Sequence, residues 1–182
     1  MHAVYGKEVG ASLEPARGAH IDYSVLGLQR TARYCRHDIR AAAQEALAAE
    51  DAGGEVPRYA AYSVWRPVQT VRKDPLAVCD WRSVDKPDLC KMTYRALSDS
   101  NKDGEYIMEA YSANPPKQPN KQRWYWMPEQ KPDEVLIIKF ADTASEHDPN
   151  IAGGCPHASP IIPGTEGEEP RCSIEARVLA FW

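Results

Sequence analysis

Short β-prone runs dominate the chain after residue 54, and they constrain its fold more than any other feature. Each run is rich in Val, Ile, Tyr, Trp or Phe and is bounded by Pro, Gly, Asn or Asp, which is typical of strands separated by turns. The runs are RYAAYSVWRPV, PLAVCDW, KMTYRAL, GEYIMEAYSA, QRWYWMP, EVLIIKFAD and SIEARVLAFW. Seven runs of this kind predict a mainly β protein built as a sandwich or a barrel.

A helical segment precedes these runs. Residues 24–52 contain strong helix formers, and their apolar residues recur at roughly helical spacing. The segment ends at Gly53–Gly54, a typical helix stop. We therefore expect one or two helices, which form a helical insert over about residues 24–54. A chain of 182 residues fits one domain with a sizeable core, so we expect residues 1–182 to form a single domain.

Composition and charge exclude several classes of function. The net charge is −4, from 22 Lys and Arg against 26 Asp and Glu, and no basic block could attract a nucleic acid. No apolar run reaches the ~18 residues of a membrane helix, and the first ten residues lack the apolar core of a secretion signal. The five cysteines are scattered and form no C-x-x-C pair. We therefore expect a cytoplasmic protein with reduced thiols.

The stretch GAHIDYS carries a His-x-Asp pair of the kind that binds metals. In an extended segment His20 and Asp22 point to the same face, because strand side chains alternate. A non-haem Fe(II) centre with two histidines and one carboxylate needs one more imidazole and leaves positions open for oxygen and substrate. On spacing alone, either His147 or His157 could supply it. We favour His157, because two isoleucines follow it and would let CPHASPII form a short buried strand.

Other residues could also bind a metal. Asp80 and Asp142 are further carboxylates, but neither has a histidine two residues away. A zinc site built on Cys155 and His157 lacks matched partners. We therefore rank these alternatives below the His-x-Asp pair.

The last run carries an anion-binding pattern. Alternation places Arg171, Ser173 and Arg177 on one polar face of the predicted strand. A guanidinium can form a two-pronged salt bridge to a carboxylate, and a hydroxyl two residues further on can add a third hydrogen bond. The Arg171-x-Ser173 pair therefore predicts a dicarboxylate clamp, although an exposed edge strand can carry the same residues.

Blocks spread over nearly the whole chain resemble the fungal Fe(II)/2-oxoglutarate-dependent oxygenases of secondary metabolism, of the gibberellin-desaturase-like hydroxylase and desaturase kind. The blocks are HIDYS, VWRPV, PLAVCDWRSVD, QRWYWMPEQKPDEVLIIKFADT, CPHASPI and PRCSIEARVLAFW. The resemblance implies a double-stranded β-helix, also called a jelly roll. It further implies that His20, Asp22 and His157 bind Fe(II).

The same resemblance implies the cosubstrate and the reaction. Arg171 and Ser173 would bind the distal carboxylate of 2-oxoglutarate, with Arg177 as the rival for that carboxylate. The activity would be hydroxylation or desaturation of a small apolar metabolite with O2 as the oxidant. Members of the family usually have a substantial region before the His-x-Asp pair, so we expect this chain to lack an N-terminal portion. The alternative function is a catalytically inactive jelly-roll remnant that binds a small molecule or a protein.

Overall fold

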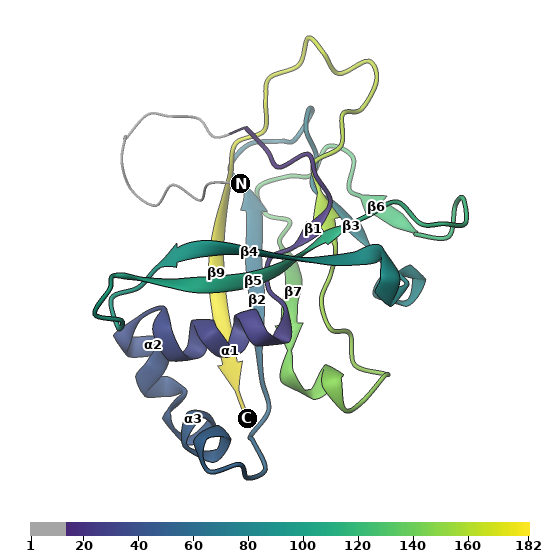
Figure 1. Ribbon diagram of the computed structural model, residues 1–182. Coiled ribbons are helices and arrows are strands. Elements are labelled where there is room, and N and C mark those ends of the chain that lie inside the picture. The colour runs from purple at the N-terminus through teal and green to yellow at the C-terminus, as the bar shows by residue number, and fades with distance from the viewer. Residues whose placement is uncertain (1–13) are drawn as a thin grey trace.

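Two antiparallel sheets form the framework of the chain, and the computed structural model describes residues 14–182 (Figure 1). One sheet has six strands in the order β4-β5-β1-β8-β3-β6, and the other has three in the order β7-β2-β9. The strands are β1 (His20–Ile21), β2 (Tyr59–Pro67), β3 (Ala77–Cys79), β4 (Leu89–Leu97), β5 (Glu105–Ala113), β6 (Trp124–Trp126), β7 (Leu136–Asp142), β8 (His157–Ala158) and β9 (Ser173–Phe181). Apart from the β4-β5 hairpin, neighbouring strands are not consecutive in the sequence, as expected of a double-stranded β-helix, and the predicted fold class is confirmed.

Each of the seven predicted runs corresponds to one strand of the structure, although β4 begins two residues before its run. Strands β1 and β8 lie outside these runs, and each is only two residues long. Strand β8 lies where CPHASPII was expected to form a short buried strand, but Ile161 of that segment is 71% exposed. Strands β1 and β8 lie next to each other in the middle of the six-stranded sheet, with His20 directly opposite His157. The most central pairing of that sheet is therefore its shortest.

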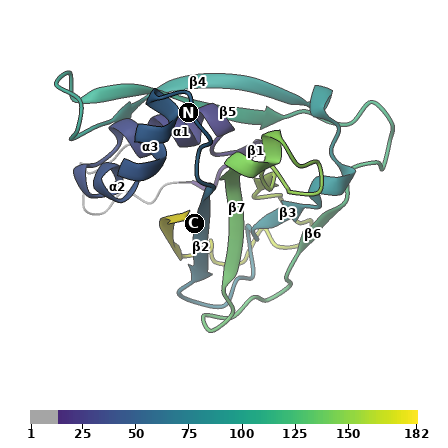
Figure 2. The same ribbon diagram turned by 90° about the horizontal axis from the view of Figure 1, so that it is seen from below.

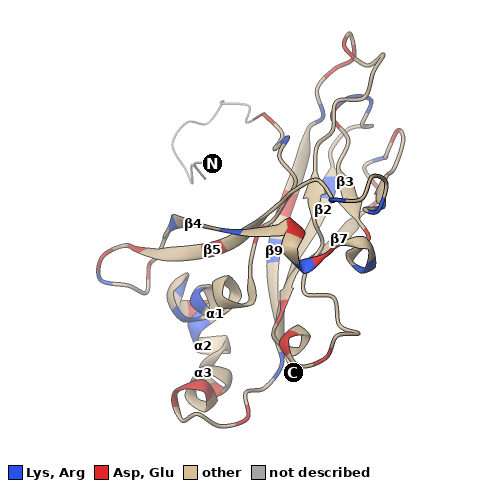
Figure 3. Ribbon diagram, turned by 45° about the vertical axis from the view of Figure 1, so that its right-hand side comes forward, with Lys and Arg blue, Asp and Glu red and all other residues tan. Residues whose placement is uncertain are grey.

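Three helices occupy the segment where one or two were expected: α1 (Val25–Tyr34), α2 (His37–Ala42) and α3 (Gln44–Asp51). The chain is extended at Arg36, which separates α1 from α2, and Ala43 leaves the helical conformation between α2 and α3. Figure 2 shows the helices grouped on the side of β4 and β5, away from β3 and β6. Basic residues on α1 face acidic residues at the end of α3 (Figure 3), where Arg33 pairs with Asp51 at 2.8 Å.

Helix α1 is fixed against β5 by its N-terminus. The Ser24 hydroxyl caps the helix by accepting a hydrogen bond from the Gly27 amide at 3.0 Å. The same hydroxyl donates to the Glu109 carboxylate of β5 at 2.6 Å. A side chain at Gly27 would lie 2.0 Å from the Glu109 carbonyl oxygen, so only glycine permits this close approach.

Strand β2 is the centre of the three-stranded sheet. Its residues Tyr59, Ala61, Ser63 and Trp65 are buried, which identifies the inner face of the sheet. Cross-strand partners share a face, and Ser63 lies opposite Ile138 of β7 and Arg177 of β9. Arg177 therefore points between the two sheets.

Strand β9 forms one edge of this sheet and pairs with β2 over all nine of its residues. Its outward-facing side chains include Ile174 and Val178, which are 56% and 43% exposed. The inward face carries the polar residues that the sequence predicted for this strand.

Candidate metal centre

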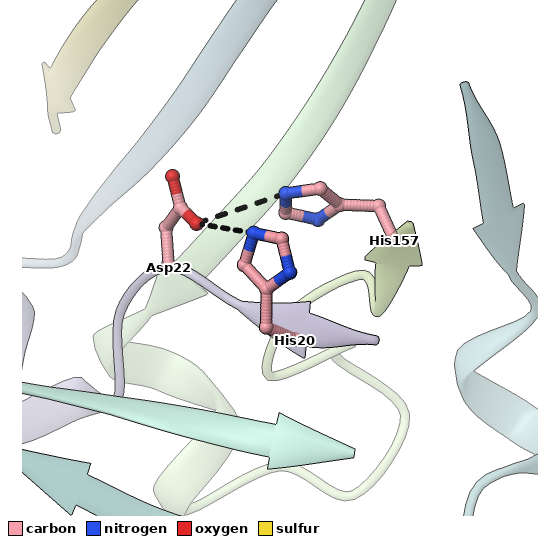
Figure 4. Close-up of side chains that lie close together, drawn as sticks. All are labelled: His20, Asp22 and His157. Carbon is pink, nitrogen blue, oxygen red and sulfur yellow. Dashed lines mark ion pairs between the residues drawn. The ribbon is translucent and has the colours of Figure 1, made fainter. Parts of the chain in front are cut away.

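Three predicted ligands, His20, Asp22 and His157, meet between the sheets (Figure 4). One ligand atom from each lies within 4.8 Å of the others. The first two come from β1 and the turn after it, whereas His157 comes from β8, and the antiparallel pairing of β1 with β8 brings them together. Their role as ligands stays a prediction.

Backbone carbonyl groups orient both imidazoles. His20 Nδ1 lies 2.7 Å from the Gly18 carbonyl oxygen, and His157 Nδ1 lies 3.0 Å from that of Cys155. A carbonyl oxygen only accepts, so each Nδ1 carries a hydrogen, and Nε2 is the nitrogen that can bind a metal when the imidazole is neutral. The two Nε2 atoms lie 3.2 and 3.7 Å from Asp22 Oδ1. Two imidazole nitrogens and one carboxylate oxygen thus face a common point, which fits a two-histidine, one-carboxylate centre.

The electrostatics of the cluster keep its carboxylate ionised. Burial lowers the pKa of His157, and the nearby Asp22 charge offsets only part of this effect. For His20 burial acts in the same direction, but the hydrogen bond and charge of Asp22 outweigh it and raise the pKa. Burial alone would raise the pKa of Asp22; the His20 hydrogen bond and the Arg177 charge lower it to about 2. The carboxylate is therefore ionised at neutral pH, as metal ligation requires.

Arg171 lies in a separate, half-buried position beside Trp65. Its guanidinium carbon is 5.3 Å from the centre of the Trp65 ring. Its Nη1 donates to the Asp74 carbonyl oxygen at 2.9 Å and to the Ser159 hydroxyl at 3.4 Å. Ser159 follows His157 by two residues, so Arg171 is close to the segment that carries a candidate ligand. Ser173 lies opposite Pro67, at the end of β2.

Arg177, the other predicted clamp residue, is next to the candidate metal ligands instead. Its Nη2 donates to Asp22 Oδ2 at 2.7 Å, and its Nε donates to Glu175 at 3.1 Å. Arg171, two residues before β9, and Arg177, within it, therefore occupy different surroundings, which the sequence pattern did not distinguish.

The rival metal ligands have other roles. His147 is exposed and follows a short 3-10 turn, Thr143–Glu146. Asp80 forms ion pairs with two arginines at the surface, and Asp142 is buried against Arg58 and Lys139. In residues 14–182 none of them belongs to the cluster of potential ligands.

Several neighbours of the site were missed by sequence reasoning. The Phe140 ring is stacked on His157, with ring centroids 5.7 Å apart. Arg17 forms an ion pair with Asp74 at 2.7 Å and lies close to Arg171 through the shared contact with Ser159. Side-chain alternation along an extended segment from His157 could have indicated that Ser159 lies on the same face. No local sequence pattern indicates that Arg17 pairs with Asp74.

Comparisons with known proteins give a consistent result. A family model described as "Oxidoreductase/YMDC permease-like domain" matches residues 3–181. The "Gibberellin cluster GA4 desaturase" of Gibberella fujikuroi is 36% identical over 97% of this chain and 53% of its own length. The "Fe(II)/2-oxoglutarate-dependent dioxygenase nvfI" of Aspergillus novofumigatus is 32% identical over 96% of this chain and 55% of its own length. This chain spans about half the length of these curated relatives.

Comparison with solved structures agrees with the comparison of sequences. The "iron and alpha-ketoglutarate-dependent endoperoxidase NvfI" superposes with a TM-score of 0.64 at 29% sequence identity, over 97% of this chain and 58% of that chain. Its W199F variant gives a TM-score of 0.63 at the same identity. Within residues 14–182, we find no helix that is long and apolar enough to cross a membrane.

Proposed function

Because the chain belongs to the fungal family of Fe(II)/2-oxoglutarate-dependent hydroxylases and desaturases, we propose that it oxidises a small secondary metabolite by hydroxylation or desaturation, with O2 as the oxidant. The observation that carries this proposal is the convergence of His20, Asp22 and His157. A shared fold alone would be weak support, because one fold hosts many chemistries. The donor set matches the chemistry of the relatives as well as their fold.

In this proposal three side chains would hold Fe(II): His20 and His157 through Nε2, and Asp22 through Oδ1. When bound, the iron and 2-oxoglutarate would activate O2 for the removal of hydrogen from a substrate carbon. The protein fixes the imidazoles through their carbonyl partners, so the ligands are oriented before the metal binds. Three protein ligands leave positions free for cosubstrate and oxygen. The Phe140 ring covers one side of His157 and excludes water there.

Arg171 is our choice for the distal carboxylate of 2-oxoglutarate, with the Ser173 hydroxyl as a second donor. Its contact Ser159 is two residues from His157, which is about 6–7 Å along an extended chain and comparable to the length of a five-carbon dicarboxylate. The two acceptors of its Nη1 are neutral oxygens, so a carboxylate would provide a stronger, charge-assisted bond. The stack on Trp65 fixes the plane of the guanidinium.

The nature of the substrate and the location of the protein are also part of this proposal. An apolar metabolite would suit the aromatic rings of Tyr23 and Phe140, which pack together beside His157. A cytoplasmic location is supported by the cysteines, because all five are free.

Anaerobic titration with Fe(II) and 2-oxoglutarate tests the proposal. We expect a visible charge-transfer band from the chelated keto acid and, in air, formation of succinate. Arg171→Gln should weaken 2-oxoglutarate binding by roughly 10- to 100-fold, since a hydrogen bond to a charged group contributes about 1.5–3 kcal/mol. The matched control is Arg66→Gln, because Arg66 lies exposed on β2, the strand that carries Trp65.

The outcomes separate the candidate functions. No band at saturating ligand would refute the metal and cosubstrate site. A band without succinate would indicate a binding module without turnover. Equal effects of the Arg171 and Arg66 substitutions would refute the assignment of the clamp.

A further inference from the structure

Arg177 forms a contact that connects the two sheets at the candidate metal centre. It lies on the inner face of β9, opposite Ser63, and its guanidinium reaches Asp22 in the turn after β1. The Nη2–Oδ2 distance is 2.7 Å, and the Asp22 side chain is only 12% exposed. A charge-assisted hydrogen bond of this length in a nearly buried position holds the carboxylate firmly.

This contact divides the two oxygens of Asp22 between two tasks. Oδ1 faces His20 Nε2 and His157 Nε2, at 3.2 and 3.7 Å, whereas Oδ2 faces Arg177. A cation between the three ligands would therefore meet only Oδ1. Binding through one oxygen occupies a single coordination position, and a second oxygen would block one of the positions that cosubstrate and oxygen need.

The guanidinium is held in place on several sides. Its Nε donates to Glu175 Oε1 at 3.1 Å, while Nη2 donates to Asp22. Its carbon lies 5.4 Å from the centre of the Phe140 ring and 5.8 Å from that of Tyr23. Aromatic faces attract a guanidinium, so both rings favour this position. The planar group thus spans two carboxylates at a fixed angle, which a lysine cannot reproduce.

We infer that Arg177 is a positioning residue of the metal centre: it holds Asp22 so that the carboxylate offers one oxygen to the cation and leaves the remaining positions open. This inference rests on the proposed function and deepens it. It also separates the roles of the two arginines, because Arg171 then serves the cosubstrate carboxylate and Arg177 serves a protein carboxylate.

Metal and cosubstrate binding, measured separately, test this division. Mn(II) binding to the protein without 2-oxoglutarate is followed by electron paramagnetic resonance, and 2-oxoglutarate binding to the Fe(II)-saturated protein is followed anaerobically by the visible band. Arg177→Gln should weaken Mn(II) binding roughly 10- to 100-fold, as is usual when an outer partner of a metal ligand is lost. At saturating Fe(II), the affinity of Arg177→Gln for 2-oxoglutarate should be unchanged. The visible band of this variant should shift, because Asp22 would coordinate the iron differently.

Arg171→Gln is the matched control, because Arg171 lies two residues before β9 and donates to Asp74 and Ser159 instead. It should leave Mn(II) affinity and band position unchanged and weaken 2-oxoglutarate binding. Arg177→Lys keeps the charge but loses the two-carboxylate geometry, so it should restore only part of the Mn(II) affinity. Full restoration would show that charge alone matters and would overturn the positioning role.

Two further results would overturn the inference. Mn(II) binding by Arg177→Gln that equals or exceeds wild type would show that repulsion between the guanidinium and the metal outweighs positioning. A selective loss of 2-oxoglutarate binding in Arg177→Gln would make Arg177 the clamp. If Arg177→Gln does not fold by circular dichroism, Glu175→Gln replaces it, because Glu175 fixes Nε and its side chain is 35% exposed. That variant should give a smaller loss of Mn(II) affinity in the same direction, and an unchanged affinity would overturn the inference.

If the wild type binds neither metal nor cosubstrate, the proposed function fails, and this inference fails with it. If the wild type binds both and Arg177→Gln behaves like it, only the inference fails.

Discussion

Replacing Asp142 with Asn should destabilise the fold without affecting metal binding. The Asp142 side chain is fully buried and accepts hydrogen bonds from Arg58 at 3.1 and 2.7 Å, from Lys139 at 2.8 Å and from the Ala144 amide at 3.1 Å. Asparagine keeps the shape but removes the negative charge that both cations face. This substitution also tests whether Asp142 is structural, since the sequence left it as a rival metal ligand.

The expected magnitude follows from the exposure of the partners. Breaking a buried ion pair by removing one member costs roughly 3–5 kcal/mol. Arg58 is 40% exposed and Lys139 is 21% exposed, so both cations can turn towards water. We therefore expect the free energy of unfolding to fall by about 2–3 kcal/mol. For a chain of this size that loss lowers the melting temperature by roughly 4–12 °C.

Urea and thermal unfolding of wild type and Asp142→Asn measure this loss. The matched control is Asp38→Asn, because Asp38 pairs with Arg36 where both side chains are more than 60% exposed. A surface pair of this kind contributes little, so the control should unfold like wild type. The reasoning is refuted if Asp142→Asn is as stable as wild type, or if the two variants lose equal stability. Loss of Mn(II) binding in folded Asp142→Asn would instead support a role at the metal centre.

Three further predictions concern pH and packing. The pKa of Asp142 is lowered in the folded state, because Arg58 and Lys139 outweigh the effect of its burial. Its contribution to the free energy of unfolding is therefore present above its unfolded pKa near 3.9 and is lost as the pH falls below that value. Between pH 5 and 2 the free energy of unfolding of wild type should fall more steeply than that of Asp142→Asn. Among the described residues, Ser63 Oγ is the one buried side-chain oxygen or nitrogen without a hydrogen-bond partner. Ser63→Ala should therefore raise the free energy of unfolding in urea by roughly 1 kcal/mol, and a clear loss of stability would show that Ser63 has a partner. Gly27→Ala should lower the free energy of unfolding by at least ~3 kcal/mol or prevent folding, whereas Gly167→Ala, with open space around it, should unfold like wild type. If the two variants were equally stable, the close approach of α1 to β5 would be disproved.

The larger strands could be predicted from the sequence because their patterns are local. Alternation and turn residues marked all seven longer runs, and the polar face of β9 was visible in Ser173 and Arg177, with Arg171 just before the strand. The two strands that hold the histidines could not be found in this way, because two residues show no period. Their side chains were identified by chemistry instead, from the His-x-Asp pair and the need for another imidazole.

The rest depends on contacts between distant segments. The break between α1 and α2 lies at Arg36, where the helical spacing of the sequence continues and only the backbone becomes extended. The ion pair of Arg17 with Asp74 joins positions that carry no common pattern, and Asp74 adopts a positive φ of 57° that favours glycine. Arg171 and Arg177 have different surroundings because Arg177 is paired within β9 whereas Arg171 precedes the strand, a boundary that the alternation pattern does not mark.

The edge position of β9 bears on how the protein behaves at high concentration. Alternate residues of this nine-residue strand direct their backbone amide and carbonyl groups away from β2 along one margin of the sheet, and Ile174 and Val178 add exposed apolar surface beside them. Such a margin accepts extended peptide from any source and is a common starting point for aggregation. Preparations of this chain should therefore be kept dilute, and a charged residue in place of Ile174 would be the first change to make for better solubility.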